Sequence, residues 1–97
     1  MQTIRITVNH PEGLHMRPAK DFVQTASEYE SEITVANVTK ESAAVNAKSY
    51  ILVLTLGVSQ GHEIEIVADG ADEQDVVAAL NELIDNNFGE ETASTSS

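Results

Sequence analysis

Residues 3–26, TIRITVNHPEGLHMRPAKDFVQTA, change from one hydrophobic period to another and thereby decide the fold. Residues 3–8 alternate polar and apolar side chains, a pattern typical of a strand with one buried face. After a loop with proline and glycine breakers at 9–13, apolar side chains recur at helical spacing from Met16 to 26 or 27. This stretch therefore predicts a strand, a short loop and a helix, with His15 at the junction.

The rest of the chain continues to alternate between strands and helices. Residues 33–36 and 63–66 predict two further strands, and residues 43–47 predict a weak one because alanine has low β propensity. Ser49 is suited to cap a short helix that ends near Gly57. A last helix follows acidic residues that suit a helix start, and its apolar stripe consists of Val76, Val77, Leu80, Leu83 and Ile84. The order βαββαβα predicts an α+β two-layer sandwich with three helices on one face of the sheet.

Length and composition predict one domain, residues 1–89, followed by a polar tail, residues 90–97, that we expect to be disordered. The N-terminal residues lack the apolar centre of a signal peptide, and no apolar run is long enough to insert into a membrane, so we expect a cytoplasmic protein. The absence of cysteine excludes disulfides, thiolate metal sites and a cysteine nucleophile.

The net charge of -11, with five Lys and Arg residues, argues against nucleic acid as a partner, because phosphates require cations. The acidic composition favours either a basic protein partner or simple solubility. His10, His15 and His62 lack the short spacing of a metal site, so we expect no metal. No cofactor is expected either.

His15 is the candidate for chemistry because it precedes a helix whose first N–H groups point outward and attract anions. Arg17 adds a guanidinium that can grip phosphate oxygens, and Pro18 fits the first helical turn. A neutral imidazole is available near pH 7 as a nucleophile. These residues predict an anion site, but their pattern leaves open whether the anion is bound or transferred.

The string Gly13-Leu-His-Met-Arg-Pro-Ala19 resembles the signature of the HPr family, the histidine phosphocarriers of the phosphoenolpyruvate-dependent sugar phosphotransferase system. The resemblance covers residues 2–88 and implies an open-faced β-sandwich with a four-stranded antiparallel sheet. It implies that His15 accepts a phosphoryl group on Nδ1 from enzyme I and passes it to enzyme IIA domains. It also implies that Arg17 and the backbone N–H groups of Met16 and Arg17 stabilise the phosphate.

The same resemblance implies two further roles. Ser49 corresponds to a regulatory serine, with HPr kinase/phosphorylase and a catabolite-control regulator as possible partners, although Ser49 could simply cap its helix. Partner docking is expected at Lys20, Tyr50, Ile51 and Leu54. Met16 and Leu52 depart from common members of the family. We expect a monomer and a phosphotransfer intermediate rather than a turnover enzyme; a non-sugar relay, or a regulatory binding module that acts through Ser49, are the alternatives.

Overall fold

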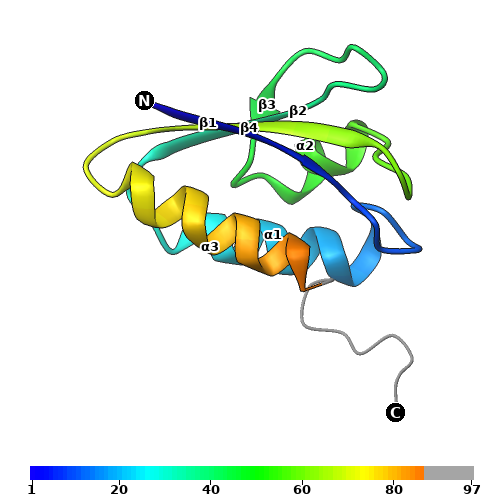
Figure 1. Cartoon of the computed structure of the whole chain (residues 1–97), viewed down its shortest axis with the longest axis horizontal. Coiled ribbons are helices and arrows are strands. Elements are labelled where there is room, and N and C mark those ends of the chain that lie inside the picture. Colours follow the sequence, from blue (N-terminus) through cyan, green and yellow to red (C-terminus); the bar gives the residue numbers. More distant parts are fainter. Residues whose placement is uncertain (87–97) are drawn as a thin grey trace.

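The computed structural model describes residues 1–86, whose elements follow the order βαββαβα (Figure 1). The strands are β1 (Gln2–Thr7), β2 (Glu32–Asn37), β3 (Val45–Asn46) and β4 (Glu63–Asp69). The helices are α1 (Met16–Ser27), α2 (Tyr50–Thr55) and α3 (Glu73–Asp85). The predicted order of elements is thus confirmed, whereas the tail predicted for residues 90–97, like residues 87–89, lies outside the described part of the chain.

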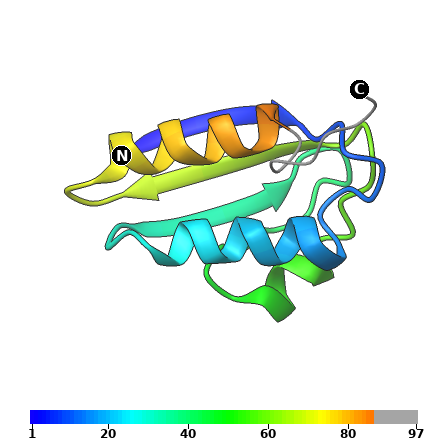
Figure 2. The ribbon, with the colours of Figure 1, turned by 90° about the horizontal axis from the view of Figure 1, so that it is seen from below.

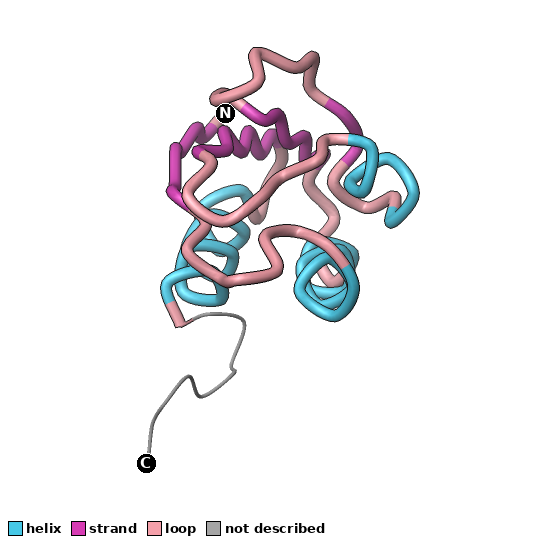
Figure 3. The backbone as a smooth tube through the Cα atoms, turned by 90° about the vertical axis from the view of Figure 1, so that its right-hand side faces the viewer, coloured by secondary structure: helices cyan, strands magenta, loops and turns pink. Residues whose placement is uncertain are grey.

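The strands form one antiparallel sheet in the order β1-β4-β2-β3. Ile66 of β4 lies opposite Ile4 on one side and Val35 on the other, so apolar side chains form a continuous row across the sheet. Figures 2 and 3 show that the helices all lie on one side of this sheet. The opposite face carries polar side chains, among them Arg5 paired with Glu65 at 3.1 Å. The predicted α+β open-faced sandwich is therefore confirmed.

The core lies between the sheet and the helices. Phe22 of α1 and Leu80 of α3 are fully buried and belong to the same hydrophobic core as Ile64 and Ile66 of the central strand β4. Two loop residues, Leu14 and Val58, are also fully buried. Burial of a large aliphatic or aromatic side chain contributes about 1.5–3 kcal/mol, so these two residues anchor their loops to the core.

Several strand boundaries differ from those predicted from the sequence. Strand β3 is only Val45–Asn46, because the alanines before it contribute little β propensity and lie exposed in the loop. Strand β4 extends to Asp69, since it is paired on both edges. Asn37, predicted to begin the loop, ends β2, where its side-chain amide donates to the Leu56 carbonyl at 3.1 Å.

Asp72 joins the start of α3 to the turn between α1 and β2. Its carboxylate accepts hydrogen bonds from the backbone N–H groups of Glu30 at 2.9 Å and Ser31 at 3.0 Å, and from the Ser31 hydroxyl. These bonds, with the Ser31 hydroxyl first, lower the pKa of Asp72. The acidic residues before this helix were expected only to suit a helix start, and for Asp72 the structure adds a contact between distant segments.

Candidate functional site

His15 is the N-cap residue of α1 and has extended backbone angles, φ -127° and ψ 163°. Its side chain makes no capping hydrogen bond to the helix, and it is half-buried rather than enclosed. The imidazole is therefore not committed to helix capping. It stands at the mouth of the helix N-terminus, as predicted from the sequence.

The first turn of α1 offers backbone donors beside His15. The N–H groups of Met16 and Arg17 precede the first possible intrahelical bond, and Pro18, which has no N–H, is buried. The Ala19 N–H reaches the His15 carbonyl only at 3.5 Å. The first turn contains no acidic residue, so the positive end of the helix dipole is not neutralised there. This arrangement favours an anion.

Met16 has a backbone conformation that residues other than glycine rarely adopt. Its φ is +54°, in the left-handed region, and its side chain is 68% exposed. Left-handed geometry costs a non-glycine residue about 1–2 kcal/mol. Since little packing at the exposed side chain offsets this cost, the strain must be held by the loop on one side and by the helix on the other.

The loop that carries His15 is fixed against the loop between α2 and β4. The Leu14 N–H donates to the Val58 carbonyl at 3.0 Å, and the Gly61 N–H donates to the Val8 carbonyl at 2.7 Å. Buried His10 braces the loop from within, because its Nδ1 accepts the Glu12 N–H at 3.0 Å. The backbone leading to His15 is therefore held at several points.

Gly13 is required by this close approach between the two loops. Its φ is +63°, and a Cβ at this position would lie 2.0 Å from the Val58 carbonyl oxygen and 2.7 Å from the Ser59 Cα. Both neighbours are backbone atoms, so they cannot rotate away as a side chain could. The glycine of the predicted signature thus lets the His15 loop pack directly on its support.

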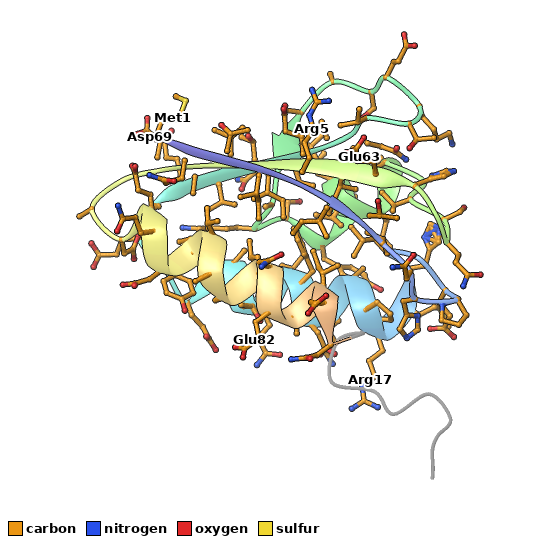
Figure 4. All side chains as sticks on the ribbon, in the orientation of Figure 1. Met1, Arg5, Arg17, Glu63, Asp69 and Glu82 are labelled. Atoms are coloured by element: carbon orange, nitrogen blue, oxygen red, sulfur yellow. The ribbon has the colours of Figure 1, made fainter. Side chains whose placement is uncertain are left out.

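Arg17 extends from the first turn of α1 into solvent (Figure 4), and its side chain is 75% exposed. Its Nε lies 4.0 Å from Oδ2 of Asp21, one turn further along α1. No contact of Asp21 with Arg17 was predicted, although the i,i+4 spacing in the sequence was sufficient to suggest one. The sequence thus located the cation correctly on the helix start but missed its counter-ion.

Two of the four residues predicted for docking line one groove beside α1. Lys20 and Tyr50 line one groove of about 600 Å³, together with Val23 and Gln24. Ile51 is 72% exposed at the start of α2. The structure therefore brings two predicted docking residues, Lys20 from α1 and Tyr50 from α2, to the same groove.

Leu54, also predicted for docking, differs from its neighbours in α2. It is half-buried and packs against the hydrophobic core. Leu52, which the sequence marked only as a departure, is 41% exposed. Positions two apart lie on nearly opposite sides of an α-helix, which explains why Leu52 and not Leu54 reaches the surface.

Ser49 is the N-cap of α2, as predicted, and its hydroxyl accepts the Leu52 N–H at 3.3 Å. The side chain is half-buried and lies at the edge of the exposed apolar residues of α2. Its observed contact is structural, and a regulatory role stays a prediction.

Residues 1–86 contain no group of three or more histidine, aspartate or glutamate side chains arranged to hold a metal ion. His62 instead takes part in a structural network, where its Nδ1 accepts the Ser59 N–H at 3.1 Å and lies 3.2 Å from the Asn37 amide nitrogen. Within the same described part of the chain, no helix is both long and apolar enough to cross a bilayer.

Comparisons with a family model, with related sequences and with solved structures all indicate the same protein family. Residues 2–86 match the family model described as the PTS HPr component phosphorylation site. A phosphocarrier protein HPr from Neisseria meningitidis serogroup A is 44% identical over 78 residues, which are 80% of this chain and 84% of that protein. A crystal structure of HPr from Thermoanaerobacter tengcongensis superposes with a TM-score of 0.88 and 44% identity, covering 95% of this chain and 100% of that one.

A longer relative contains only a part that is similar to this chain. The multiphosphoryl transfer protein of Haemophilus influenzae is 39% identical over 84 residues. These residues are 87% of this chain but 17% of that protein. Similarity to this relative therefore extends to one segment of a much larger polypeptide.

Proposed function

This chain belongs to the HPr family of the phosphotransferase system, and we propose that it relays a phosphoryl group through His15. In this proposal the donor is phospho-enzyme I and the acceptors are enzyme IIA domains. The observation that carries it is the placement of an uncommitted imidazole at the open N-terminus of α1. The chain is then a phosphorylated intermediate that returns to its starting state after each transfer.

The transfer step exchanges one bond to phosphorus for another. The lone pair of His15 Nδ1 attacks the phosphorus of the donor, and the bond between phosphorus and the donor's leaving group breaks. The leaving group keeps the electron pair of that bond, and the imidazole carries the phosphoryl group with its proton on Nε2. The reverse exchange with the next acceptor restores neutral His15, so no oxidant, reductant or cofactor is needed.

Backbone geometry supports Nδ1 as the attacking atom. Nδ1 is the ring nitrogen closer to the main chain, so a phosphoryl group on it lies nearer to the N–H groups of Met16 and Arg17 than one on Nε2. Oriented backbone donors and a helix dipole stabilise such an anion. The Arg17 side chain is exposed at the first turn of α1, and its guanidinium would donate to the phosphoryl oxygens in a bidentate manner.

Partner docking is assigned to the surface formed by Lys20, Val23, Gln24, Tyr50 and Ile51, which we call the α1–α2 face. Exposed aromatic and aliphatic side chains around a groove are the usual core of a protein interface. We propose that the chain acts as a monomer in the cytoplasm. This proposal leaves open the identity of the sugar or other substrate system that the relay serves.

A regulatory role through Ser49 is the second candidate. Its half-exposed hydroxyl lies beside the α1–α2 face, so a phosphate there would place about two negative charges next to the apolar docking surface. Such a charge would weaken the docking of apolar or acidic partners. HPr kinase/phosphorylase and a catabolite-control regulator are the partners in this version.

The test is incubation of the purified chain with phosphoenolpyruvate and enzyme I, followed by intact-mass measurement before and after mild acid. We expect one acid-labile phosphate on the wild type and on Ser49→Ala, and none on His15→Ala. An acid-stable phosphate, or a phosphate that persists on His15→Ala, would contradict transfer through His15. The second candidate predicts instead an acid-stable phosphate that requires a kinase and is lost in Ser49→Ala.

A further inference from the structure

The ion pair between Arg17 and Asp21 bears on the energy of the phosphorylated state. The Asp21 side chain is 28% exposed, and its carboxylate forms an ion pair with Arg17. Arg17 is thus a shared cation, because it faces a carboxylate in the unmodified protein and would face a phosphoryl group on His15. One guanidinium cannot serve both anions equally well.

We propose that Asp21 is a positioning residue that competes with the phosphoryl group for Arg17 and thereby sets how readily phosphorylated His15 gives up its phosphoryl group. This inference rests on the proposed phosphocarrier function. When His15 is phosphorylated, Arg17 must loosen its contact with Asp21 in order to reach the phosphoryl oxygens. Loss of this contact makes phosphorylation of His15 less favourable, so the phosphoryl group is transferred more readily to the next acceptor.

Direct repulsion acts in the same direction as this competition. Asp21 follows His15 by six positions, which corresponds to a rise of about 9 Å along an α-helix. This separation is within the Debye length of about 10 Å at 0.1 M salt, so the carboxylate also repels a phosphoryl dianion on His15. The contact with Arg17 stabilises the unmodified state and the repulsion destabilises the phosphorylated state, so both effects make phosphorylation of His15 less favourable.

The size of the effect is limited by the exposure of the pair. Exposed ion pairs of this kind shift an equilibrium by only a few-fold. We therefore expect Asp21→Asn to move the phosphoryl-exchange equilibrium with enzyme I toward the phosphorylated chain by about two- to fivefold. The shift should shrink at high salt, since both the contact and the repulsion are screened.

The experiment measures the equilibrium constant for phosphoryl exchange with enzyme I, approached from both directions, in the wild type and in Asp21→Asn. Asp21→Glu keeps the charge and should stay close to the wild type. Glu28→Gln is the matched control, because Glu28 is an exposed carboxylate at the other end of α1. This control removes the same charge and should change the constant much less.

A double-mutant cycle separates competition from repulsion. In an Arg17→Ala background there is no shared cation, so Asp21→Asn should retain only the part of its effect that comes from direct repulsion. An equal shift in both backgrounds, or no shift of Asp21→Asn in the wild-type background, would overturn the role of Asp21 while the carrier function stands. A wild-type chain that accepts no phosphoryl group would overturn the proposed function and this inference together.

Discussion

Replacing Gly13 with alanine tests whether the loop that carries His15 depends on direct backbone contact with its support. The new Cβ would lie 2.0 Å from the Val58 carbonyl oxygen and 2.8 Å from the Val58 carbonyl carbon. The two loops must therefore separate. Their separation would break the 3.0 Å hydrogen bond from the Leu14 N–H to the same carbonyl, at a residue that is fully buried.

The expected cost has two parts. Alanine at a φ of +63° is strained by about 1–2 kcal/mol. Loss of the hydrogen bond of Leu14 leaves a buried donor unsatisfied and adds about 2 kcal/mol. Because each kcal/mol lowers the Tm of a domain of this size by about 4–8 °C, the separation of the loops should contribute roughly 8–16 °C beyond the backbone strain.

Gly61→Ala supplies the matched control. Gly61 also has a positive φ, +90°, but a Cβ there would meet no atom within 4 Å. It should therefore suffer the backbone strain without the clash. Thermal unfolding followed by circular dichroism would compare the two variants, and equal Tm values would refute the argument from loop contact. Phosphoryl acceptance from enzyme I, measured well below both Tm values, should fall more in Gly13→Ala because only that change displaces the backbone of His15.

Three further predictions concern stability. Met16→Gly should raise the free energy of unfolding by about 1 kcal/mol, because it relieves the strain of a left-handed backbone. Glu41→Gly, at a φ of +55°, should do the same. Urea unfolding in which Met16→Gly lowers this free energy would contradict the explanation. Ser49→Ala should cost about 1 kcal/mol through loss of the α2 cap, detectable as a lower urea midpoint, and an unchanged midpoint would mean that the cap contributes nothing. Because hydrogen bonds lower the pKa of Asp72 in the folded state, its stabilising contribution is present above its usual pKa of 3.8 and is lost as pH falls through the lowered value. Urea unfolding should therefore show a wild-type advantage over Asp72→Asn at pH 7 that shrinks at pH 3, and a pH-independent difference would count against this explanation.

The fold could be predicted from the sequence largely because its local patterns agree with one another. The change from alternating to helical periodicity around His15 placed β1 and α1 within a residue or two. Ser49 correctly marked the start of α2, where neither strand nor helix was favoured by the apolar run alone. Element order and the helix-covered sheet followed from these local patterns.

Contacts between distant segments could not be predicted in the same way. The hydrogen bonds from the turn before β2 to Asp72 join residues that are 41 and 42 positions apart. The packing of Gly13 on Val58 likewise depends on where two loops meet after the sheet has formed. Periodicity and propensity describe each element by itself, so such contacts become visible only in three dimensions.

Two of the five cations of this acidic chain lie near the start of α1, a placement that bears on the proposed relay. Arg5 is paired with Glu65 on the sheet face away from the helices, and the Lys48 ammonium donates to the Tyr29 carbonyl at 2.7 Å.

Arg17 and Lys20 lie exposed in the first half of α1, close in sequence to His15. With a net charge of -11, most of the surface repels an acidic protein, and the two cations near the start of α1 weaken this repulsion there. Electrostatic orientation of this kind acts on the encounter rather than on the final contact, which the apolar α1–α2 face would provide. In the proposed relay, these two cations would orient an acidic patch of a partner protein, and Arg17 would afterwards hold the phosphoryl group that is exchanged.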